Sequence, residues 1–241
     1  MTQKNIFTAG HLNIFFGQAH EFPMAIRNHE EVFPHCNQVA KELGLEKLAR
    51  TNQVHGIDGR VVDGARKIRA QDENFLVESD ETKGDYLITT APNVGLAIFT
   101  ADCLPVVFYD PIKRVIANAH AGWRGSVTGI CSVVIKRMRE DFDCSPRDIQ
   151  VWLGAAGKEC CYEVTSEFPV RDAAFIKRRE GKIYFDNIAF NLAKLHAAGI
   201  TNNRIHLDYN DCTICDHRYH SYRRSADKTN YAAQATIVWL T

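Results

Sequence analysis

The stretch Leu96-Ala97-Ile98-Phe99-Thr100-Ala101-Asp102-Cys103-Leu104-Pro105-Val106-Val107-Phe108-Tyr109 decides how this chain folds. Two short apolar runs, rich in β-branched and aromatic residues, flank a polar segment, and such runs are typical of buried strands. Similar runs at Tyr86-Leu87-Ile88 and Val115-Ile116-Ala117 predict two more strands, and Asp110-Pro111 predicts a turn. The middle of the chain is therefore expected to form short consecutive strands.

Apolar residues recur with helical spacing before and after these strands in the sequence. We expect an amphipathic helix over residues 36–49, whose apolar face includes Leu48. A second helix is expected after Gly125, where apolar residues again recur with a helical period, and Ser126 is its expected N-cap. These helices would cover the strands that lie between them.

The C-terminal half adds one helix and three strands. The helix is expected between Asp186 and Gly199, and the strands at residues 151–153, 205–207 and 235–240. Because the strands cluster and do not alternate regularly with helices, the pattern favours an α+β class or a layered sandwich over a doubly wound sheet. The chain contains no linker rich in Pro, Gly or Ser, so we expect residues 1–241 to form a single domain.

Composition excludes several classes of partner. Lys+Arg and Asp+Glu both number 29, so the formal charge is zero, which argues against broad binding to nucleic acid or an anionic membrane. No apolar run approaches the roughly 20 residues of a membrane span, and the first residues lack a signal-peptide core. We therefore expect a cytoplasmic protein whose eight cysteines are mostly free thiols.

Three side chains at the ends of apolar runs are candidate metal ligands. Cys103 follows one predicted strand, and His120 opens the segment His120-Ala121-Gly122-Trp123-Arg124-Gly125. His55, in Gln53-Val54-His55-Gly56, supplies a third. Two histidines and one cysteine leave a zinc ion one open tetrahedral position, which is typical of a catalytic site. Taken singly, Cys103 is equally compatible with a buried structural role, a lone histidine at the place of His120 is more often a core residue, and His55 carries almost no specificity.

Four residues near these ligands have two interpretations each. Asp102 is the nearest candidate acid or base, or it caps a turn. Trp123 stacks a planar base, or it belongs to the core. Arg124 precedes a helix and either binds an anion such as phosphate or pairs with a surface carboxylate. Gly122, like Gly125, indicates close approach of the backbone to a neighbour or an unusual dihedral angle.

A separate metal site is a further hypothesis. Cys212 and Cys215 form a C-x-x-C pair, and His217 and His220 follow closely. The spacing from Cys215 to the histidines is shorter than in the usual zinc-finger patterns, which argues against a finger.

Taken together, these segments resemble the YfiH-like family of proteins. The resemblance covers about residues 50 to 240 and rests on its His, Cys and His-Ala-Gly-Trp-Arg-Gly signatures. Gly84-Asp85-Tyr86-Leu87-Ile88-Thr89, Cys160-Cys161-Tyr162-Glu163-Val164 and the C-terminal segments Cys212-Thr213 and His220-Ser221-Tyr222-Arg223-Arg224 also match. Proteins of this family were formerly called laccase-domain or multicopper polyphenol oxidases and are now regarded as purine nucleoside phosphorylases.

The resemblance implies a layered α-β-β-α sandwich with mixed sheets, similar to the fold of a cytotoxic necrotizing factor. It implies zinc bound by His55, Cys103 and His120, and phosphorolysis of adenosine, inosine and methylthioadenosine together with deamination of adenosine. Nucleoside and phosphate are then the partners, and Arg124, Arg223 and Arg224 are candidates for holding phosphate. Copper has also been ascribed to the family, but the chain has no His-x-His pair of the kind that multicopper oxidases use.

The chain departs from the family pattern in three places that bear on substrate choice. The early Gly-Val-Ser and Asn-Leu signatures of the family are not recognisable in residues 10–35. The loop before Cys160 is Gly154-Ala155-Ala156-Gly157-Lys158-Glu159, and the usual closing Thr-Gly-Arg is Thr229-Asn230-Tyr231. Two other functions therefore remain open. One is a cysteine hydrolase with Cys103 as nucleophile and His120 as base, acting on a cell-wall precursor such as a peptidoglycan building block. The other is a zinc-stabilised binding protein that has lost turnover.

Overall fold

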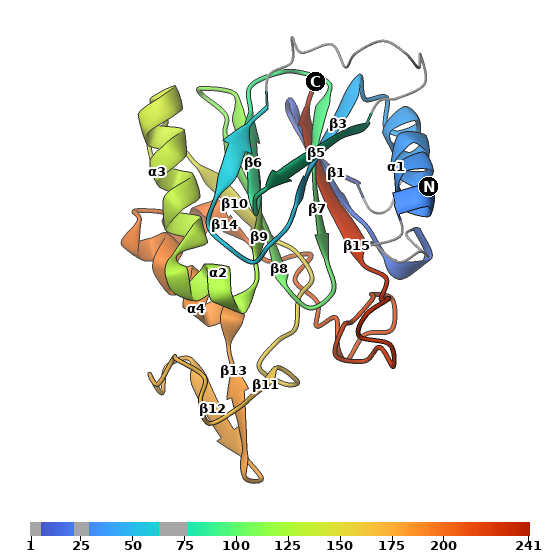
Figure 1. The fold of residues 1–241 in the computed structure, drawn as a ribbon. Helices are drawn as coiled ribbons and strands as arrows, with labels where there is room; N and C mark the ends of the chain where they lie inside the picture. Colours follow the sequence, from blue (N-terminus) through green and yellow to red (C-terminus); the bar gives the residue numbers. More distant parts are fainter. Residues whose placement is uncertain (1–5, 22–28, 63–76) are drawn as a thin grey trace.

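The computed structural model of the chain describes residues 6–21, 29–62 and 77–241 (Figure 1). Within these residues, two six-stranded sheets pack face to face, and helices cover both outer faces. Parallel and antiparallel pairs occur in both sheets. The fold is the layered α-β-β-α sandwich with mixed sheets, of class α+β, that the sequence and its family resemblance led us to expect.

The strand order of each sheet mixes early and late segments of the chain. The first sheet runs β1 (Ile6–Ala9), β2 (Leu12–Phe16), β15 (Gln234–Leu240), β7 (Val94–Thr100), β3 (Lys47–Asn52) and β5 (Val77–Lys83). The second runs β14 (Ile205–His206), β10 (Gln150–Leu153), β8 (Leu104–Asp110), β9 (Val115–Ala121), β6 (Tyr86–Thr89) and β4 (Gly59–Val61). A strand is therefore present at every apolar run for which the sequence predicted one.

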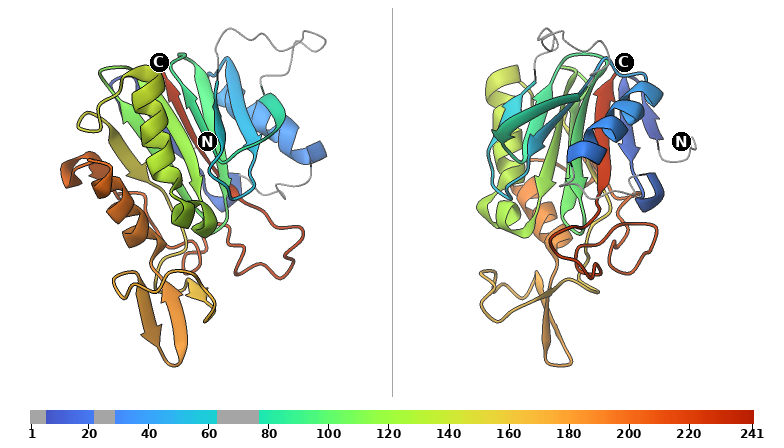
Figure 2. Two further views of the ribbon diagram at one scale, coloured as in Figure 1. Left: turned by 60° about the vertical axis from the view of Figure 1, so that its left-hand side comes forward. Right: turned by 45° about the vertical axis from the view of Figure 1, so that its right-hand side comes forward.

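Helices lie on opposite outer faces of the sandwich. Figure 2 shows α1 (His29–Glu42) against the first sheet and α3 (Ile130–Phe142) along the second. The short α2 (Trp123–Thr128) and α4 (Asn187–Ala197) lie beside α3. A small sheet of β11 (Glu163–Val164), β13 (Lys182–Phe185) and β12 (Ile176–Arg179) extends from one end, at the bottom of Figure 1.

Side chains of the central strands alternate between the two faces of each sheet, and they build three apolar layers. Every residue of β7, β8, β9 and β15 is buried, because both faces of each strand are covered. In β8, Val106 and Phe108 pack toward α3, whereas Val107 and Tyr109 pack between the two sheets. This period of two is the reason that these strands read as continuous apolar runs.

A buried asparagine links the two sheets. Asn118 of β9 is completely buried, and its Nδ2 donates hydrogen bonds to the backbone oxygens of Leu96 on β7 (2.9 Å) and Thr236 on β15 (2.8 Å). A polar side chain in this position fixes the relative placement of the sheets, because a slip would leave its amide without partners in an apolar layer.

Two helix predictions were wrong in their bounds. The helix expected over 36–49 is α1, which ends at Glu42, and Leu48 lies in β3. Gly44, at a φ of +69°, stops the helix, and the chain then pairs with β7 and β5. Leu48 packs under α1 from the strand, so its helical spacing was coincidental.

The helix after Gly125 is also divided differently from the prediction. Ser126 lies inside α2, whose N-cap is Gly122, and Gly129 at a φ of +101° separates α2 from α3. Ser126 uses its hydroxyl to bond the backbone oxygen of Ala121, at 3.3 Å, and does not cap a helix. By contrast, the predicted start of α4 is confirmed, since the Asp186 carboxylate accepts from the Ala189 backbone N–H at 2.8 Å.

Among the residues that the structure describes, we find no helix with the length and apolar character needed to cross a membrane.

Candidate active and metal-binding site

Strand pairing brings the three candidate ligands together. The register of β8 with β9 pairs Pro105 with His120, so Cys103, just before β8, lies beside His120. His55 arrives on the loop after β3. The ligand atoms of His55, Cys103 and His120 lie within 4.8 Å of one another, and the two imidazole rings have centroids 4.7 Å apart. The arrangement has room for one metal ion.

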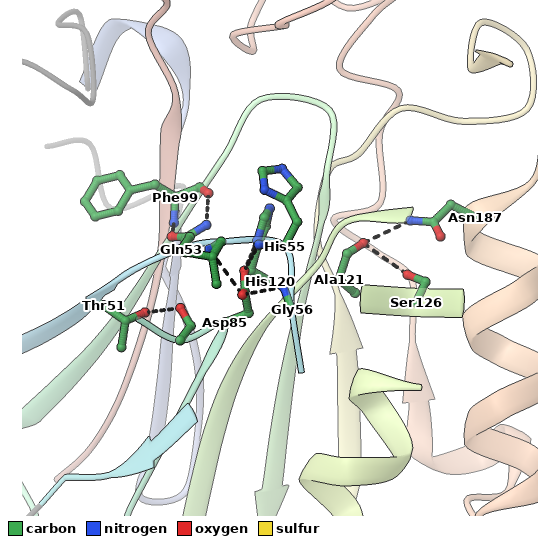
Figure 3. A network of polar contacts seen from close by, with 12 residues as sticks. Thr51, Gln53, His55, Gly56, Asp85, Phe99, His120, Ala121, Ser126 and Asn187 are labelled. Carbon is green, nitrogen blue, oxygen red and sulfur yellow. Dashed lines mark hydrogen bonds and ion pairs between the residues drawn. The ribbon is translucent and has the colours of Figure 1, made fainter. Parts of the chain in front are cut away.

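Asp85 joins two of these ligands (Figure 3). Its carboxylate is fully buried and lies 2.7 Å from Nδ1 of His120, which leaves Nε2 of that ring to face a metal. The same carboxylate accepts backbone N–H groups of Val54, His55 and Gly56, at 3.2, 2.9 and 2.7 Å. A carboxylate on the second nitrogen of a ligating histidine is a recurrent feature of zinc sites, because it fixes the tautomer and ring orientation.

The loop that carries His55 is held in an uncommon conformation. His55 has a φ of +63°, in the left-handed region that non-glycine residues seldom occupy. Beside it, the Gln53 side chain donates to the Phe99 oxygen and accepts from the Phe99 N–H, both at 2.8 Å (Figure 3). These bonds and those to Asp85 fix the loop on both sides, so the strained backbone is maintained.

Gly122 makes space for all three ligands. A Cβ atom at this position would lie 2.9 Å from Cδ2 of His55, 3.1 Å from Sγ of Cys103 and 3.6 Å from Cε1 of His120. A Cβ at Gly125 would lie 2.8 Å from the backbone oxygen of Gly56. The close approach predicted from the two glycines is therefore present at both.

Cys103 and His120 shift each other's pKa. Burial alone would raise the pKa of the Cys103 thiol, but the charge of His120 and hydrogen bonds from both histidines lower it to about 6. Burial would lower the pKa of His120, but the negative charge of Cys103 and the hydrogen bond with Asp85 raise it to about 9. The site therefore favours a thiolate, the form of cysteine that binds metals.

Asp102 organises the wall of the site. Its φ is +86°, its side chain is buried, and its carboxylate accepts from Thr213 Oγ1 (2.7 Å), Ser221 Oγ (3.0 Å) and the Arg223 backbone N–H (2.8 Å). Such bonds anchor the C-terminal loop against the Cys103 turn. Of the two interpretations of Asp102, they favour the structural one.

The three ligands line a cleft of about 1340 Å³. Aromatic and cationic side chains surround it. Aromatic rings suit a flat substrate, and cations suit an anion such as phosphate. The aromatic members are Phe33, Phe99, Trp123, Tyr162, Tyr222 and Tyr231, and the cationic members are Arg50, Arg124, Arg223 and Lys228.

Trp123 and the predicted arginines have different surroundings. Trp123 lines the cleft and also packs on Phe168, with ring centroids 5.2 Å apart. Arg124 stacks on the Trp123 ring at 4.5 Å, and Arg223 stacks on Tyr162 at 4.1 Å. Arg224, by contrast, is not among the residues that line the cleft. Its guanidinium donates to the backbone oxygens of Thr213, Ile214, Asp216 and Tyr219, so it holds the loop together.

With the geometry established, we compared the chain with known proteins. Residues 26–241 match the model of a family described as multi-copper polyphenol oxidoreductase laccase. The chain belongs to this family, the YfiH-like or laccase-domain family. A relative from Borreliella burgdorferi, named purine nucleoside phosphorylase, is 34% identical over 169 residues, which are 65% of this chain and 69% of the relative. A relative of the same name from Aquifex aeolicus is 34% identical over 68% of this chain and 74% of its own.

Solved structures of the laccase-domain family share the fold. YlmD from Geobacillus stearothermophilus has a TM-score of 0.75 and 26% identity, covering 95% of this chain and 91% of its own. YfiH from Bacillus licheniformis has a TM-score of 0.78 and 24% identity, covering 95% of this chain and 93% of its own.

Sequence reasoning missed two residues of this laccase-domain site. Asp85 lies in the segment Gly84–Thr89, for which the sequence predicted only a strand, yet it contacts His120 and the His55 loop. A Gly-Asp pair directly before an apolar strand was the available signal. Arg50 lies on β3 and lines the cleft beside Phe33 and Phe99, with its guanidinium carbon 5.3 Å from each ring centroid. Its sequence context, Ala49-Arg50-Thr51, carried no signal of that position.

Proposed function

We propose that this chain is a zinc-dependent purine nucleoside phosphorylase that also deaminates adenosine. One observation carries the proposal: His55, Cys103 and His120 converge in a large cleft lined by aromatic and cationic groups. The name shared by relatives 34% identical to this chain supports the same reading. The substrates would be a purine nucleoside and inorganic phosphate.

The donor set fits zinc. One thiolate and two imidazoles are ligands that zinc prefers, and Asp85 orients one of them. A multi-copper centre would need several groups of histidines. In the described parts of the chain, the groups of side chains that could hold a metal contain only two histidines, His55 and His120. When bound, zinc would supply a Lewis acid next to the reacting end of the nucleoside.

Phosphate would be held by the arginines that line the cleft. Arg50 is the strongest candidate, because no carboxylate pairs with it among the residues described and its Nη1 has no hydrogen-bond partner there. Its guanidinium carbon lies 5.3 Å from the ring centroids of both Phe33 and Phe99, and these contacts hold a cation at the wall of the cleft. Arg124 and Arg223 are likewise held on aromatic rings.

The aromatic residues would hold the flat purine. Trp123 is half-buried and is covered in part by Arg124, so it offers its remaining ring surface. Tyr162 is buried under Arg223 and forms part of the cleft wall. Tyr222 and Tyr231 pack edge to face, with ring centroids 4.9 Å apart, and line another part of the cleft. Base stacking on such rings is favourable and tolerates different purines.

In the proposed phosphorolysis, a phosphate oxygen forms a bond to C1′ of the ribose while the bond from C1′ to the purine nitrogen breaks. The electron pair of that bond leaves with the base, which takes up a proton. Arginines positioned on the phosphate would align the two reactants, and alignment accounts for much of the rate in such transfers. Asp102 would act as a positioning residue, because it anchors the segment that carries Arg223.

The proposed deamination differs from phosphorolysis in its nucleophile. Water replaces the amino group of adenosine, and ammonia leaves.

Product analysis tests the proposal. With adenosine and phosphate, we expect adenine and ribose 1-phosphate in addition to inosine and ammonia; without phosphate, only inosine and ammonia are expected. Cys103→Ala removes a ligand and should abolish both reactions, whereas Cys144→Ala, a buried thiol outside the cleft, should retain them. No product above a heat-killed control would contradict the proposal. Metal-free protein that is fully active and is inhibited by iodoacetamide would instead support a cysteine hydrolase.

A second experiment tests the phosphate site. Arg50→Gln should raise the KM for phosphate at least tenfold, because charge-assisted contacts to phosphate are lost. The control is Arg137→Gln, which removes an exposed arginine paired with Asp141 on α3 and should leave that KM unchanged. An unaltered KM in Arg50→Gln would remove Arg50 from the proposed phosphate site.

A further inference from the structure

A second cluster of thiols lies outside the three-ligand site. Cys160 and Cys161 lie on the loop that follows β10, and Cys212 and Cys215 lie on the loop between β14 and β15. Their four sulfurs lie within 4.8 Å of one another. Individual separations are 3.4 Å for Cys160–Cys212, 3.5 Å for Cys160–Cys215 and 3.0 Å for Cys161–Cys215. Segments more than fifty residues apart thus bring four soft ligands to one point.

We propose that Cys160, Cys161, Cys212 and Cys215 form a structural zinc site of the four-thiolate type. Zinc binds sulfur at about 2.3 Å with tetrahedral geometry, so ligand sulfurs lie about 3.8 Å from one another. The observed separations need only small side-chain rotations to reach that value. Four protein ligands fill every position, which makes the site structural and leaves none for substrate.

The composition of this site differs from the sequence hypothesis. Cys212 and Cys215 are ligands as suggested, but the group that contains them has no histidine. Its other half is the adjacent pair Cys160-Cys161. The short spacing from Cys215 to the histidines therefore has no bearing on this site, because its four ligands are cysteines from two separate loops.

The backbone holds the two cysteine loops side by side. Ala156, on the loop that leads to Cys160, forms a parallel bridge with Cys212, and its N–H donates to the Asp211 oxygen at 3.0 Å. The turn Cys212-Thr213-Ile214-Cys215 is closed by the Asp216 N–H, which donates to the Cys212 oxygen at 2.9 Å. These contacts fix the segments that carry the four sulfurs.

Arg224 supports the same turn from outside. It donates to the backbone oxygens of Thr213 at 2.7 Å and Ile214 at 3.0 Å, and so places a positive charge beside the turn that joins Cys212 to Cys215. A zinc ion with four thiolates carries net negative charge, which a nearby guanidinium would offset.

The site would join the two loops that form one wall of the cleft. Thr213 N–H donates to the Ala156 oxygen, at 3.0 Å, and the Gly157 N–H donates to the Asp102 oxygen, at 2.9 Å. Thr213 also bonds the Asp102 carboxylate. Zinc at the four cysteines would therefore stabilise the positions of Tyr162 and Arg223, which line the cleft. Its role would be that of a cross-link between loops.

Metal analysis of the purified holoprotein tests this site independently of the proposed function. Cys103→Ala disables the three-ligand site, so that variant should still hold one zinc ion per chain. Adding Cys212→Ser and Cys215→Ser should reduce zinc to near zero, and adding Cys144→Ala instead should not. Absence of zinc from Cys103→Ala, or zinc content unaffected by the Cys212 and Cys215 changes, would overturn the inference.

A titration that needs no change in the four cysteines guards against misfolding. Adding a mercurial thiol reagent to Cys103→Ala should release one zinc as four thiols react. Peptide mapping that finds these four cysteines paired in disulfides would overturn the proposal.

Cobalt spectroscopy counts the thiolates at each site. After replacement of zinc by Co²⁺, Cys103→Ala should have a sulfur-to-cobalt absorption about four times as intense as that of the Cys212→Ser/Cys215→Ser variant, because four thiolates bind in place of one. Equal intensities would contradict it.

Discussion

Asp85 contacts two of the three metal-binding residues. It lies 2.7 Å from His120 Nδ1 and accepts three N–H groups of the His55 loop. We predict that Asp85→Asn weakens zinc binding at the three-ligand site about 10- to 100-fold, because the tautomer and basicity of His120 are no longer fixed. Competition with a chromophoric chelator measures this.

The control for Asp85→Asn is Asp110→Asn. Asp110 is equally buried and accepts the N–H groups of Ile112 and Lys113, both at 2.9 Å, in a turn without metal ligands. Its replacement should leave zinc affinity unchanged. Equal affinities in Asp85→Asn and the wild type would show that the carboxylate has no influence on the metal.

Gly122 provides a steric test at the same scale. A methyl group there would overlap His55 and Cys103, at 2.9 and 3.1 Å, so Gly122→Ala should lower zinc occupancy and activity while the chain stays folded. Gly56→Ala is the matched control, because its Cβ would come no closer than 3.5 Å to Asp85. Isothermal calorimetry with zinc compares the two, and unchanged binding by Gly122→Ala would contradict the prediction.

Cys103 should have a distinct pH dependence in chelator-treated protein. Its pKa of about 6 means that the thiol is mostly protonated below pH 6 and mostly thiolate above it. Alkylation by iodoacetamide should therefore rise through about pH 6 and level off near neutrality. Cys131 serves as internal reference, because burial raises its pKa to about 12 and it should not react over this range. A Cys103 midpoint near pH 9, read by mass spectrometry, would contradict the mutual stabilisation with His120.

At the scale of elements, Asn118 is the polar link between the sheets. Asn118→Ala removes two hydrogen bonds from β9 to β7 and β15, and should lower the free energy of unfolding by about 1–3 kcal/mol because two buried partners lose their donor. Urea denaturation measures the loss. Asn13→Ala on β2 should cost less, because the two contacts of its Nδ2 are 3.5 Å long and its Oδ1 accepts only from the partly exposed Thr8 hydroxyl, at 2.9 Å. Equal losses would mean that the link between sheets has no special role.

The elements also reveal what the sequence could and could not predict. The central strands follow from their apolar runs, since both faces are buried, and α4 follows from Asp186 and its helical spacing. Leu48 fits a helical period but lies in β3, because pairing with β7 and β5 outweighs local spacing.

Contacts between distant segments account for most of what was missed in the site. Cys103 and His120 were found because each ends an apolar run. Asp85 and Arg50 were not, because their roles depend on the register that places β6 beside β9 and β3 beside β7. The same holds for Cys160-Cys161, whose approach to Cys212 is set by the path of two loops.

At the scale of the whole molecule, the sandwich brings both metal-ligand groups to one cleft and its wall. Zinc should therefore stabilise the fold as a ligand of the native state. At a free zinc concentration of 100 times its dissociation constant, one site contributes about 2.7 kcal/mol. Thermal unfolding with and without chelator should show this shift in the wild type, and a smaller one in Cys103→Ala. An identical shift in both proteins would argue against zinc at the three-ligand site.

The most direct test of the central claim follows adenine production as zinc is returned to chelated protein. We predict that adenosine is cleaved to adenine only when phosphate is present. The rate should rise in proportion to zinc bound in the wild type and stay at background in Cys103→Ala. Adenine formed at the full rate by zinc-free protein, or formed equally without phosphate, would contradict a zinc-dependent phosphorylase built on His55, Cys103 and His120.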